Sequence, residues 1–230
     1  FSTLLGTDST VAAQALASVS QVRSLGAGLP FGVMDQQFVS GTEISFRPGS
    51  VAPAGSINAP AGSSCKYYGG NGVRDVIMSA AFGGADACPI DIGQSIETQT
   101  GVTSGNLTQG FDARIGTNTD SFSDVFSFNA TTGTYVINKP SSPRLGIIPL
   151  AGGGGNWPLT AGQSMVVSGY AFVYIGDRTR SPSYPALTGS GNGLRIHLTP
   201  VIAPLPSTWD VNFTTYQPGS NNIIAYRLVS

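Results

Sequence analysis

The sequence predicts a mainly β protein: an antiparallel sheet or sandwich with a few short helices and long loops rich in Gly, Pro and Ser. Three observations lead to this prediction. Apolar residues fill both alternating faces of 164–175, which is typical of a strand covered on both sides. Short apolar runs recur at 29–34, 145–150 and 194–202. The chain also contains 31 Gly and 15 Pro, which separate such runs into strands and turns.

The N-terminal part of the chain reads as strands followed by a loop. Residues 9–22 fit a helix by the spacing of Val11, Ala15 and Val19, but small residues also alternate there as in a strand. Strands are expected at 29–34 and 37–46. The Pro-, Gly- and Ser-rich stretch 47–64 reads as a loop and as the possible internal boundary of a single domain covering 1–230.

The clearest helix signal lies at 72–82. Asn71 can cap the first turn, Val73, Val76 and Ile77 form an apolar stripe, and Gly83 follows the last turn.

The two cysteines of the chain, Cys65 and Cys88, stand on either side of this helix. A disulfide between them would close a loop, and the lost chain entropy of the unfolded state would stabilise the fold by roughly 3 kcal/mol. The alternative is a pair of buried free thiols; the flanking positions favour the disulfide.

The segments after this helix alternate between short strands and turns. Extended pieces are expected around Ile90, Ile92 and Ile96, with a break at Gly93, and Leu107, Phe111 and Ile115 have the spacing of a second helix, which Gly110 weakens. Short polar turns are expected over 116–129. The remaining strands are expected at 134–137, 145–150, 164–175, 194–202 and 223–229, and loops at 152–155 and 177–193. Met165, Val167, Gly169, Ala171, Val173 and Ile175 would share one face of the 164–175 strand.

Composition and charge exclude several classes of function. Only 10% of residues are charged and the net charge is −1, so the chain lacks the basic surface that nucleic acid requires. A hydrophobic fraction of 40% is too high for a disordered chain. No apolar run reaches the ~20 residues of a membrane helix. A chain that starts at Phe1 is expected to be processed or truncated, and few charges with a predicted disulfide indicate an extracellular or cell-surface setting.

No residues form a catalytic, cofactor-binding or strong metal-binding pattern. His197 is the only histidine and reads as a surface or edge residue of a strand. Asn118, Asp120 and Asp124 could offer oxygens to calcium, but a polar loop that caps a short helix is the better interpretation. Asn-x-Ser/Thr sequons make glycosylation possible at Asn106, Asn129 and Asn212.

The order of several motifs resembles the TadE/TadG-like family, which is associated with assembly of bacterial tight-adherence (Flp-type) pili. The resemblance covers most of 1–230, and SPRLGIIPL at 142–150, VVSGYAFVYI at 166–175 and the tail IIAYRLVS continue it. The residues that match the central motifs are Val73, Arg74, Asp75, Cys88, Ile92, Gly93, Glu97, Thr98, Gly101, Gly105, Gly110, Asp112, Arg114 and Ile115.

The resemblance implies a non-enzymatic structural or accessory component of an extracellular pilus or surface filament. It also favours a strand at 9–22. Low charge leaves little repulsion between copies, so contacts with self or with other pilus subunits are expected through strand edges near the chain ends. The candidate edge residues are Val11, Ala13, Ala15, Ile223, Ile224 and Leu228.

Two other functions remain possible from the sequence. A glycan-binding adhesin would use aromatic residues such as Trp157 and Trp209, and a jelly-roll capsid-like protein would share the many strands.

Overall fold

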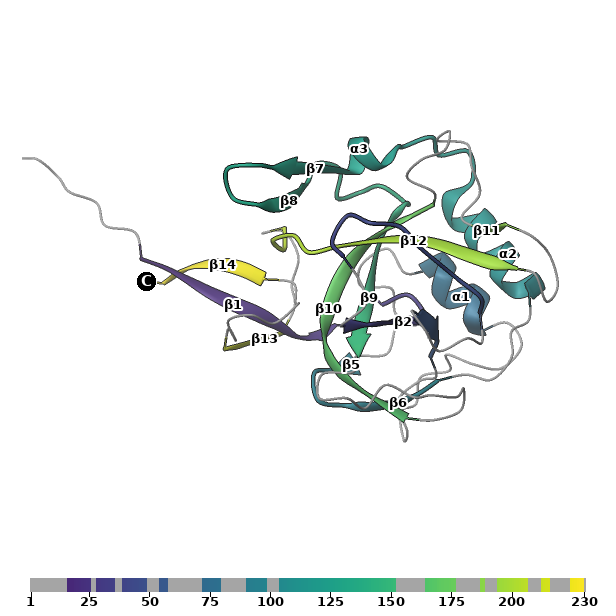
Figure 1. The fold of residues 1–230 in the computed structure, drawn as a ribbon, viewed down its shortest axis with the longest axis horizontal. Helices are drawn as coiled ribbons and strands as arrows, with labels where there is room; N and C mark the ends of the chain where they lie inside the picture. Colours follow the sequence, from purple (N-terminus) through teal and green to yellow (C-terminus); the bar gives the residue numbers. More distant parts are fainter. Residues whose placement is uncertain are drawn as a thin grey trace, which may run out of the picture.

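The computed structural model confirms a strand-rich fold with few short helices (Figure 1). The residues it describes are 16–25, 28–35, 39–48, 54–57, 72–79, 90–98, 104–151, 164–176, 187–188, 194–206, 212–215 and 224–229.

The described helices all lie between β4 and β7. The helices are α1 (Gly72–Ser79), α2 (Ser104–Ile115) and α3 (Phe122–Val125). The strands are β1 (Leu16–Leu25), β2 (Phe31–Met34), β3 (Ile44–Phe46), β4 (Ala54–Ser56), β5 (Ile90–Asp91), β6 (Ser95–Glu97), β7 (Phe126–Asn129), β8 (Thr134–Ile137), β9 (Leu145–Ala151), β10 (Ser164–Ile175), β11 (Leu187–Thr188), β12 (Arg195–Val201), β13 (Asn212–Thr215) and β14 (Ile224–Val229).

The larger sheet has the strand order β11-β12-β10-β9-β2-β4, with β3 also paired to β12 and β6 to β10. Its pairs are antiparallel except β2 with β9, where Val33 lies opposite Leu150 in a parallel register. The sheet is therefore mixed rather than wholly antiparallel. Strand β4 lies inside 47–64, which was predicted to be a loop, and pairs with β2. That prediction was wrong for 54–56, because Ala-Gly-Ser offers no apolar alternation to reveal a strand.

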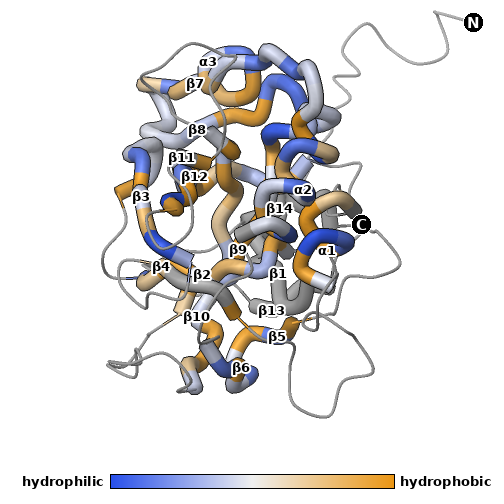
Figure 2. The backbone as a smooth tube through the Cα atoms, turned by 90° about the vertical axis from the view of Figure 1, so that its right-hand side faces the viewer, coloured by the Kyte–Doolittle hydropathy of each residue, from blue (hydrophilic) through white to orange (hydrophobic). Residues whose placement is uncertain are grey.

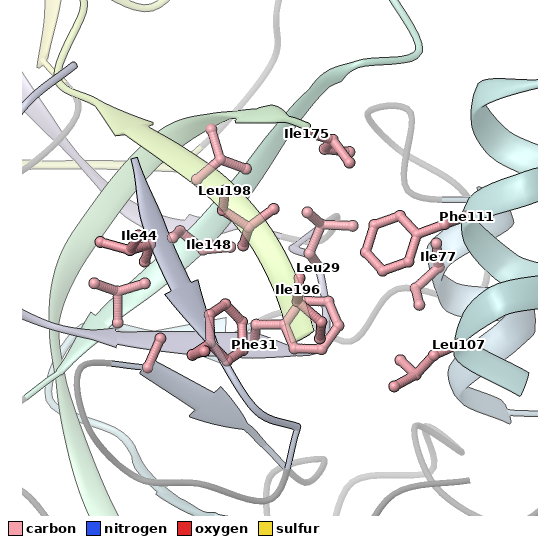
Figure 3. Close-up of a cluster of buried hydrophobic side chains, with 14 of the residues drawn as sticks. Leu29, Phe31, Ile44, Ile77, Leu107, Phe111, Ile148, Ile175, Ile196 and Leu198 are labelled. Carbon is pink, nitrogen blue, oxygen red and sulfur yellow. The ribbon is translucent and has the colours of Figure 1, made fainter. Parts of the chain in front are cut away.

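Both faces of the larger sheet are buried, as predicted for 164–175. On one face, α1 and α2 direct Ile77, Leu107 and Phe111 toward the sheet residues Phe31 and Ile196 (Figure 3). The opposite face of β10 is covered by short elements from three parts of the chain: β5 and β6, α3 with β7, and the segment after β12. Figure 2 shows α1 and α2 next to each other at one side of the strands. Helices on one side and strands or loops on the other thus enclose β10.

A β-bulge at Ser168 changes the face assignment that the sequence predicts for β10. Val167 lies opposite Ala151 and Gly169 opposite Leu150, so Ser168 is the extra residue. Because of this insertion, Met165 and Val167 join Tyr170 on one face instead of joining Ala171 on the other. The Ser168 hydroxyl donates to Asp35 Oδ2 over 2.9 Å, which anchors the bulge to the end of β2.

Helix α2 forms as predicted, and Gly110 supports its packing rather than weakening it. A Cβ at this position would lie 3.0 Å from Cβ of Ile77 and 3.2 Å from the carbonyl oxygen of Arg74. The absence of a side chain therefore allows α1 to cross α2 closely. Helix α1 begins at Gly72 as predicted, and residues 80–82 lie outside the described part of the chain.

A smaller sheet of four strands joins β1 to β13 and β14, which lie far along the sequence, and to β5, where Ser24 lies opposite Asp91. Strand β1 is its central strand, with β14 paired along Leu16–Gln21 and β13 paired along 20–24. In Figure 1 this sheet projects to one side of β9, β10 and β12. The described part of 9–22 is thus a strand, as favoured. Ser20 and Gln21 pair on both sides and are not edge positions, whereas Leu16–Val19 pair only with β14 among the described strands.

The remaining short elements follow the predictions with small changes of extent. Of the described residues 39–46, only 44–46 form a strand, because Gly41 (φ +80°) makes a turn before it. Strands β5 and β6 flank the turn at Gly93 as expected. Phe122 and Val125 belong to a short helix that runs directly into the β7–β8 hairpin.

Candidate functional site

A polar network around Asp120 is the densest group of charged and hydrogen-bonding side chains among the described residues. Asp120 follows α2 and is buried. Its Oδ1 accepts a hydrogen bond from Lys139 Nζ at 2.5 Å. Its Oδ2 accepts from Asn118 Nδ2 at 2.9 Å and from the Ser142 hydroxyl at 2.7 Å. Both carboxylate oxygens are thus engaged by side chains of the chain itself.

Arg144 and Tyr174 attach this network to the larger sheet. The Tyr174 hydroxyl donates to the Asp120 carbonyl at 2.8 Å. The Arg144 guanidinium donates to the carbonyls of Asn118 and Ile175 and lies 5.8 Å from the centre of the Tyr174 ring. An arginine at this distance from an aromatic face gains a favourable cation–π contact. The loop after α2 is therefore fixed to the ends of β9 and β10.

The pKa values in the network follow from these contacts. Burial raises the pKa of Asp120, but hydrogen bonds from Lys139, Asn118 and Ser142 outweigh it and lower that pKa to about 2. Burial is also the main cause that raises the pKa of Tyr174. At neutral pH the Asp120 carboxylate is therefore charged and can accept hydrogen bonds, and the Tyr174 phenol is protonated and can donate one.

The candidate calcium ligands do not form one cation site. The Lys139 ammonium contacts Asp120 Oδ1, so a positive charge from the protein already lies where a cation would bind. Asp124 faces away from this arrangement: its Oδ2 accepts from the backbone nitrogen and the hydroxyl of Ser121, which caps α3. No group of three or more His, Cys, Asp or Glu side chains suited to a metal occurs among the described residues. The alternative interpretation, a polar loop capping a short helix, is confirmed for α3.

Arg114 is a second buried cation, and it was singled out only through the family resemblance. It donates to the carbonyl oxygens of Ile77 at 3.0 Å, Pro143 at 2.7 Å and Leu145 at 2.7 Å. Ile77 lies in the last turn of α1, where free carbonyls favour a positive charge. Burial lowers the pKa of Arg114 to about 10, so it remains charged at neutral pH. The signal in the sequence is an arginine on the apolar stripe of Leu107 and Phe111.

His197 is buried, so the prediction of a surface or edge residue was wrong. Its neighbours in β12 pair on both sides: Ile196 lies opposite Phe46 and Leu187, and Leu198 opposite Ile44 and Ile175. The strand is therefore internal at this point. His197 Nδ1 lies 2.9 Å from Glu43 Oε1, and this carboxylate was not identified from the sequence.

The other candidate residues fall in different parts of the fold. Asn106 lies in α2, Asn129 ends β7 and Asn212 begins β13. Ile224 and Leu228 belong to β14, opposite Gln21 and Ala17 of β1. Several candidates lie outside the described residues: Val11, Ala13, Ala15, Cys65, Cys88, Trp157, Trp209 and Ile223.

Strand β14 has one paired side in the described part of the chain. One side of it pairs with β1 over the whole length from Leu16 to Gln21. On its other side, the described part of the chain contains no paired strand. An open edge presents backbone donors and acceptors to another strand.

Comparison with known proteins identifies no relative: no family model matches the chain, and no curated protein or solved structure does so either. Across the described ranges, none of the helices has both the length and the apolar character needed to cross a bilayer.

Proposed function

We propose that this chain is a structural or accessory component of an extracellular bacterial pilus or surface filament, and that it acts by assembling with other chains. The open edge of β14 in the projecting β13-β1-β14 sheet is the observation that carries the proposal (Figure 1). Strand addition at such an edge is a general mode of protein assembly, in which backbone hydrogen bonds supply the affinity.

The sequence of this edge supports the proposal. The six residues of β14, IAYRLV, include one charged residue and no proline. Proteins that avoid strand addition commonly place lysines, prolines or bulges on their edges. A net charge of −1 for the whole chain adds little repulsion between copies. The edge therefore lacks the usual obstacles to pairing with a second strand.

The motifs that resemble TadE/TadG-like proteins are consistent with a structural role. Arg114 joins α2 to the end of α1 and to the start of β9, and Arg144 joins the loop after α2 to the end of β10. Both of these matching residues donate hydrogen bonds to backbone carbonyls within the fold. They hold separate motif segments together. This supports the proposal that the motifs stabilise the fold and that the chain is a non-enzymatic component.

Proline substitution along β14 tests the proposal. In an edge strand, alternate backbone nitrogens point toward the neighbouring strand and toward the open side. Ala225 and Tyr226 are adjacent, so the backbone nitrogen of one faces β1 and that of the other faces the open side. Ala225→Pro and Tyr226→Pro therefore form a matched pair: one substitution removes a hydrogen bond to β1, and the other removes a donor from the open edge. We expect the intact chain to associate at high concentration, and the open-edge variant to stay monomeric with an unchanged circular dichroism spectrum.

Sedimentation velocity over a range of concentrations measures this self-association. Pull-down with candidate pilus subunits measures whether the chain also binds other partners. Deletion of 222–230 provides a second variant that should also abolish assembly. If the intact chain remains monomeric and neither change affects binding to pilus subunits, assembly through β14 is wrong.

A further inference from the structure

We infer that Asn129 is an acceptor for an N-linked glycan, and that the folded chain presents this sequon while it protects those at Asn106 and Asn212. The inference does not depend on the proposed role in filaments. It rests on the positions of three chemically equivalent Asn-x-Thr sequons in three different local structures.

The Asn129 sequon lies at the tip of a hairpin. Asn129 is the last residue of β7, and residues 130–133 turn the chain into β8, closed by a hydrogen bond from the Gly133 nitrogen to the Asn129 carbonyl at 2.8 Å. Every residue from 127 to 133 is exposed. The base of the hairpin is held by buried Phe126, while the tip projects away from the helices α1 and α2 (Figure 1). A transferase can therefore approach the whole sequon from solvent.

The side chains of this sequon leave the reacting groups accessible. Asn129 Oδ1 accepts from the Thr131 and Thr132 nitrogens at 2.9 and 3.3 Å, so these contacts use the oxygen of the carboxamide and leave its nitrogen to react. The hydroxyl residue of the sequon is Thr131. The nearby hydroxyl that shares a hydrogen bond with Thr134 belongs instead to Thr132.

The chemistry is transfer of a glycosyl group from a donor activated by a diphosphate. The Asn129 amide nitrogen forms a bond to the anomeric carbon of the sugar, and the bond from that carbon to the diphosphate oxygen breaks. The electron pair of the broken bond leaves with the diphosphate. The amide nitrogen loses one proton to a base of the transferase, and no oxidation or reduction takes place.

The other two sequons are incorporated into regular structure. The Asn106 sequon lies within α2, and its middle residue Leu107 is fully buried. The Asn212 sequon lies in β13, where Phe213 and Thr214 pair with Val22 and Gln21 of β1. Modification at either position requires a local opening of the fold, and such openings are rare for core helices and paired strands.

The test uses a soluble N-glycosyltransferase that transfers one glucose from UDP-glucose to Asn-x-Ser/Thr. The folded chain and the chain held unfolded in urea, at a concentration that the enzyme tolerates, are each incubated with the enzyme and mapped by peptide mass spectrometry. We expect one hexose on Asn129 of the folded chain, with modification at Asn106 and Asn212 slower on the order of 100-fold, since it waits for local opening. In the unfolded chain, the three sites should react at similar rates.

Two threonine variants provide a matched control. Thr131→Val removes the sequon hydroxyl and should abolish modification of Asn129, whereas Thr132→Val, at the next exposed position, should leave it in place. The inference is overturned if Asn129 stays unmodified in the folded chain while it reacts in the unfolded one, or if Asn106 or Asn212 reacts as fast as Asn129 in the folded chain.

Discussion

Buried arginines define this protein at the scale of single residues. Arg114 and Arg144 are both buried, and each donates to backbone carbonyls of distant segments. A guanidinium can satisfy several carbonyls at once because its donors form a rigid planar fork. Each of these side chains thereby connects backbone segments that are distant in sequence.

Replacing Arg114 tests the contribution of one such connection. Arg114→Lys should lower the free energy of unfolding by about 2–4 kcal/mol, because one ammonium cannot replace a fork that reaches three buried carbonyls. Arg195→Lys is the control, since Arg195 is exposed and its replacement should change stability by less than about 0.5 kcal/mol. Urea unfolding followed by tryptophan fluorescence measures both values. Equal stability of the two variants would show that the carbonyl contacts contribute little.

Asp120 gives the protein a defined acid dependence. Its pKa falls from an ordinary 3.8 to about 2 in the folded state. A folded-state pKa below the unfolded value stabilises the fold above pH 4, and this stabilisation is lost as the pH falls toward 2. Asp120→Asn should therefore be less stable than the natural chain at pH 7, and the difference should shrink between pH 4 and pH 2. Urea unfolding at a series of pH values checks this; a difference that is constant with pH would contradict it.

At the scale of elements, the bulge in β10 decides which side chains face which core. Deletion of Ser168 would restore a regular alternation and turn Met165 and Val167 to the opposite face of the sheet. We expect this deletion to prevent stable folding. Ser168→Ala keeps the bulge and removes only the bond to Asp35, so it should cost about 1 kcal/mol. Circular dichroism and thermal unfolding distinguish the two variants; a deletion variant as stable as the alanine variant would exclude the bulge as a determinant of register.

Two glycines of α2 offer a matched comparison of propensity with packing. Gly105→Ala meets no atom within 4 Å and should gain up to about 1 kcal/mol of helix propensity. Gly110→Ala gains the same propensity but presses a Cβ against Ile77 and the Arg74 carbonyl, and should be the less stable variant by about 1–3 kcal/mol. Thermal melts of both proteins test the order. A Gly110 variant that melts as high as the Gly105 variant would mean that α1 moves away freely.

The difference between these elements also shows what could be predicted from the sequence. Strands β9, β10 and β12 follow from short apolar runs, and helix α2 follows from apolar residues at four-residue spacing. The bulge at Ser168, the strand at 54–56 and the parallel pairing of β2 with β9 depend on tertiary contacts and leave no periodic signal. In the site, Asn118 and Asp120 lie in a polar loop before a short helix, as predicted, and Asp124 lies in the first turn of that helix. The partners Lys139 and Ser142 lie too far along the chain to be found by spacing.

At the scale of the whole molecule, few charges and two buried sheet faces indicate a fold held mainly by apolar packing. Salt screens exposed charges strongly and buried pairs weakly. Asp120 with Lys139 and His197 with Glu43 are the pairs with a buried member among the described residues, and only 10% of the chain is charged. We therefore expect the thermal midpoint to shift by no more than a few degrees when sodium chloride is raised from low to about 1 M, the range over which the screening length falls severalfold. Differential scanning fluorimetry measures the shift, and a large loss of stability in salt would reveal a major electrostatic contribution.

The pairing of β1 with β14 also has a consequence for the order of events during synthesis. Leu16 lies opposite Val229, so the two strands are separated by about 200 residues of chain. Contacts at such separation form late, since a long loop must first be closed. A ribosome releases β1 long before β13 and β14 exist. Until those two strands emerge, β1 can pair among the described strands only with β5, at Ser24 and Leu25, and the rest of its backbone waits unpaired. During that interval, chaperones or a strand of another chain can bind β1. The duration of translation therefore helps to determine whether the sheet closes within one molecule or between two.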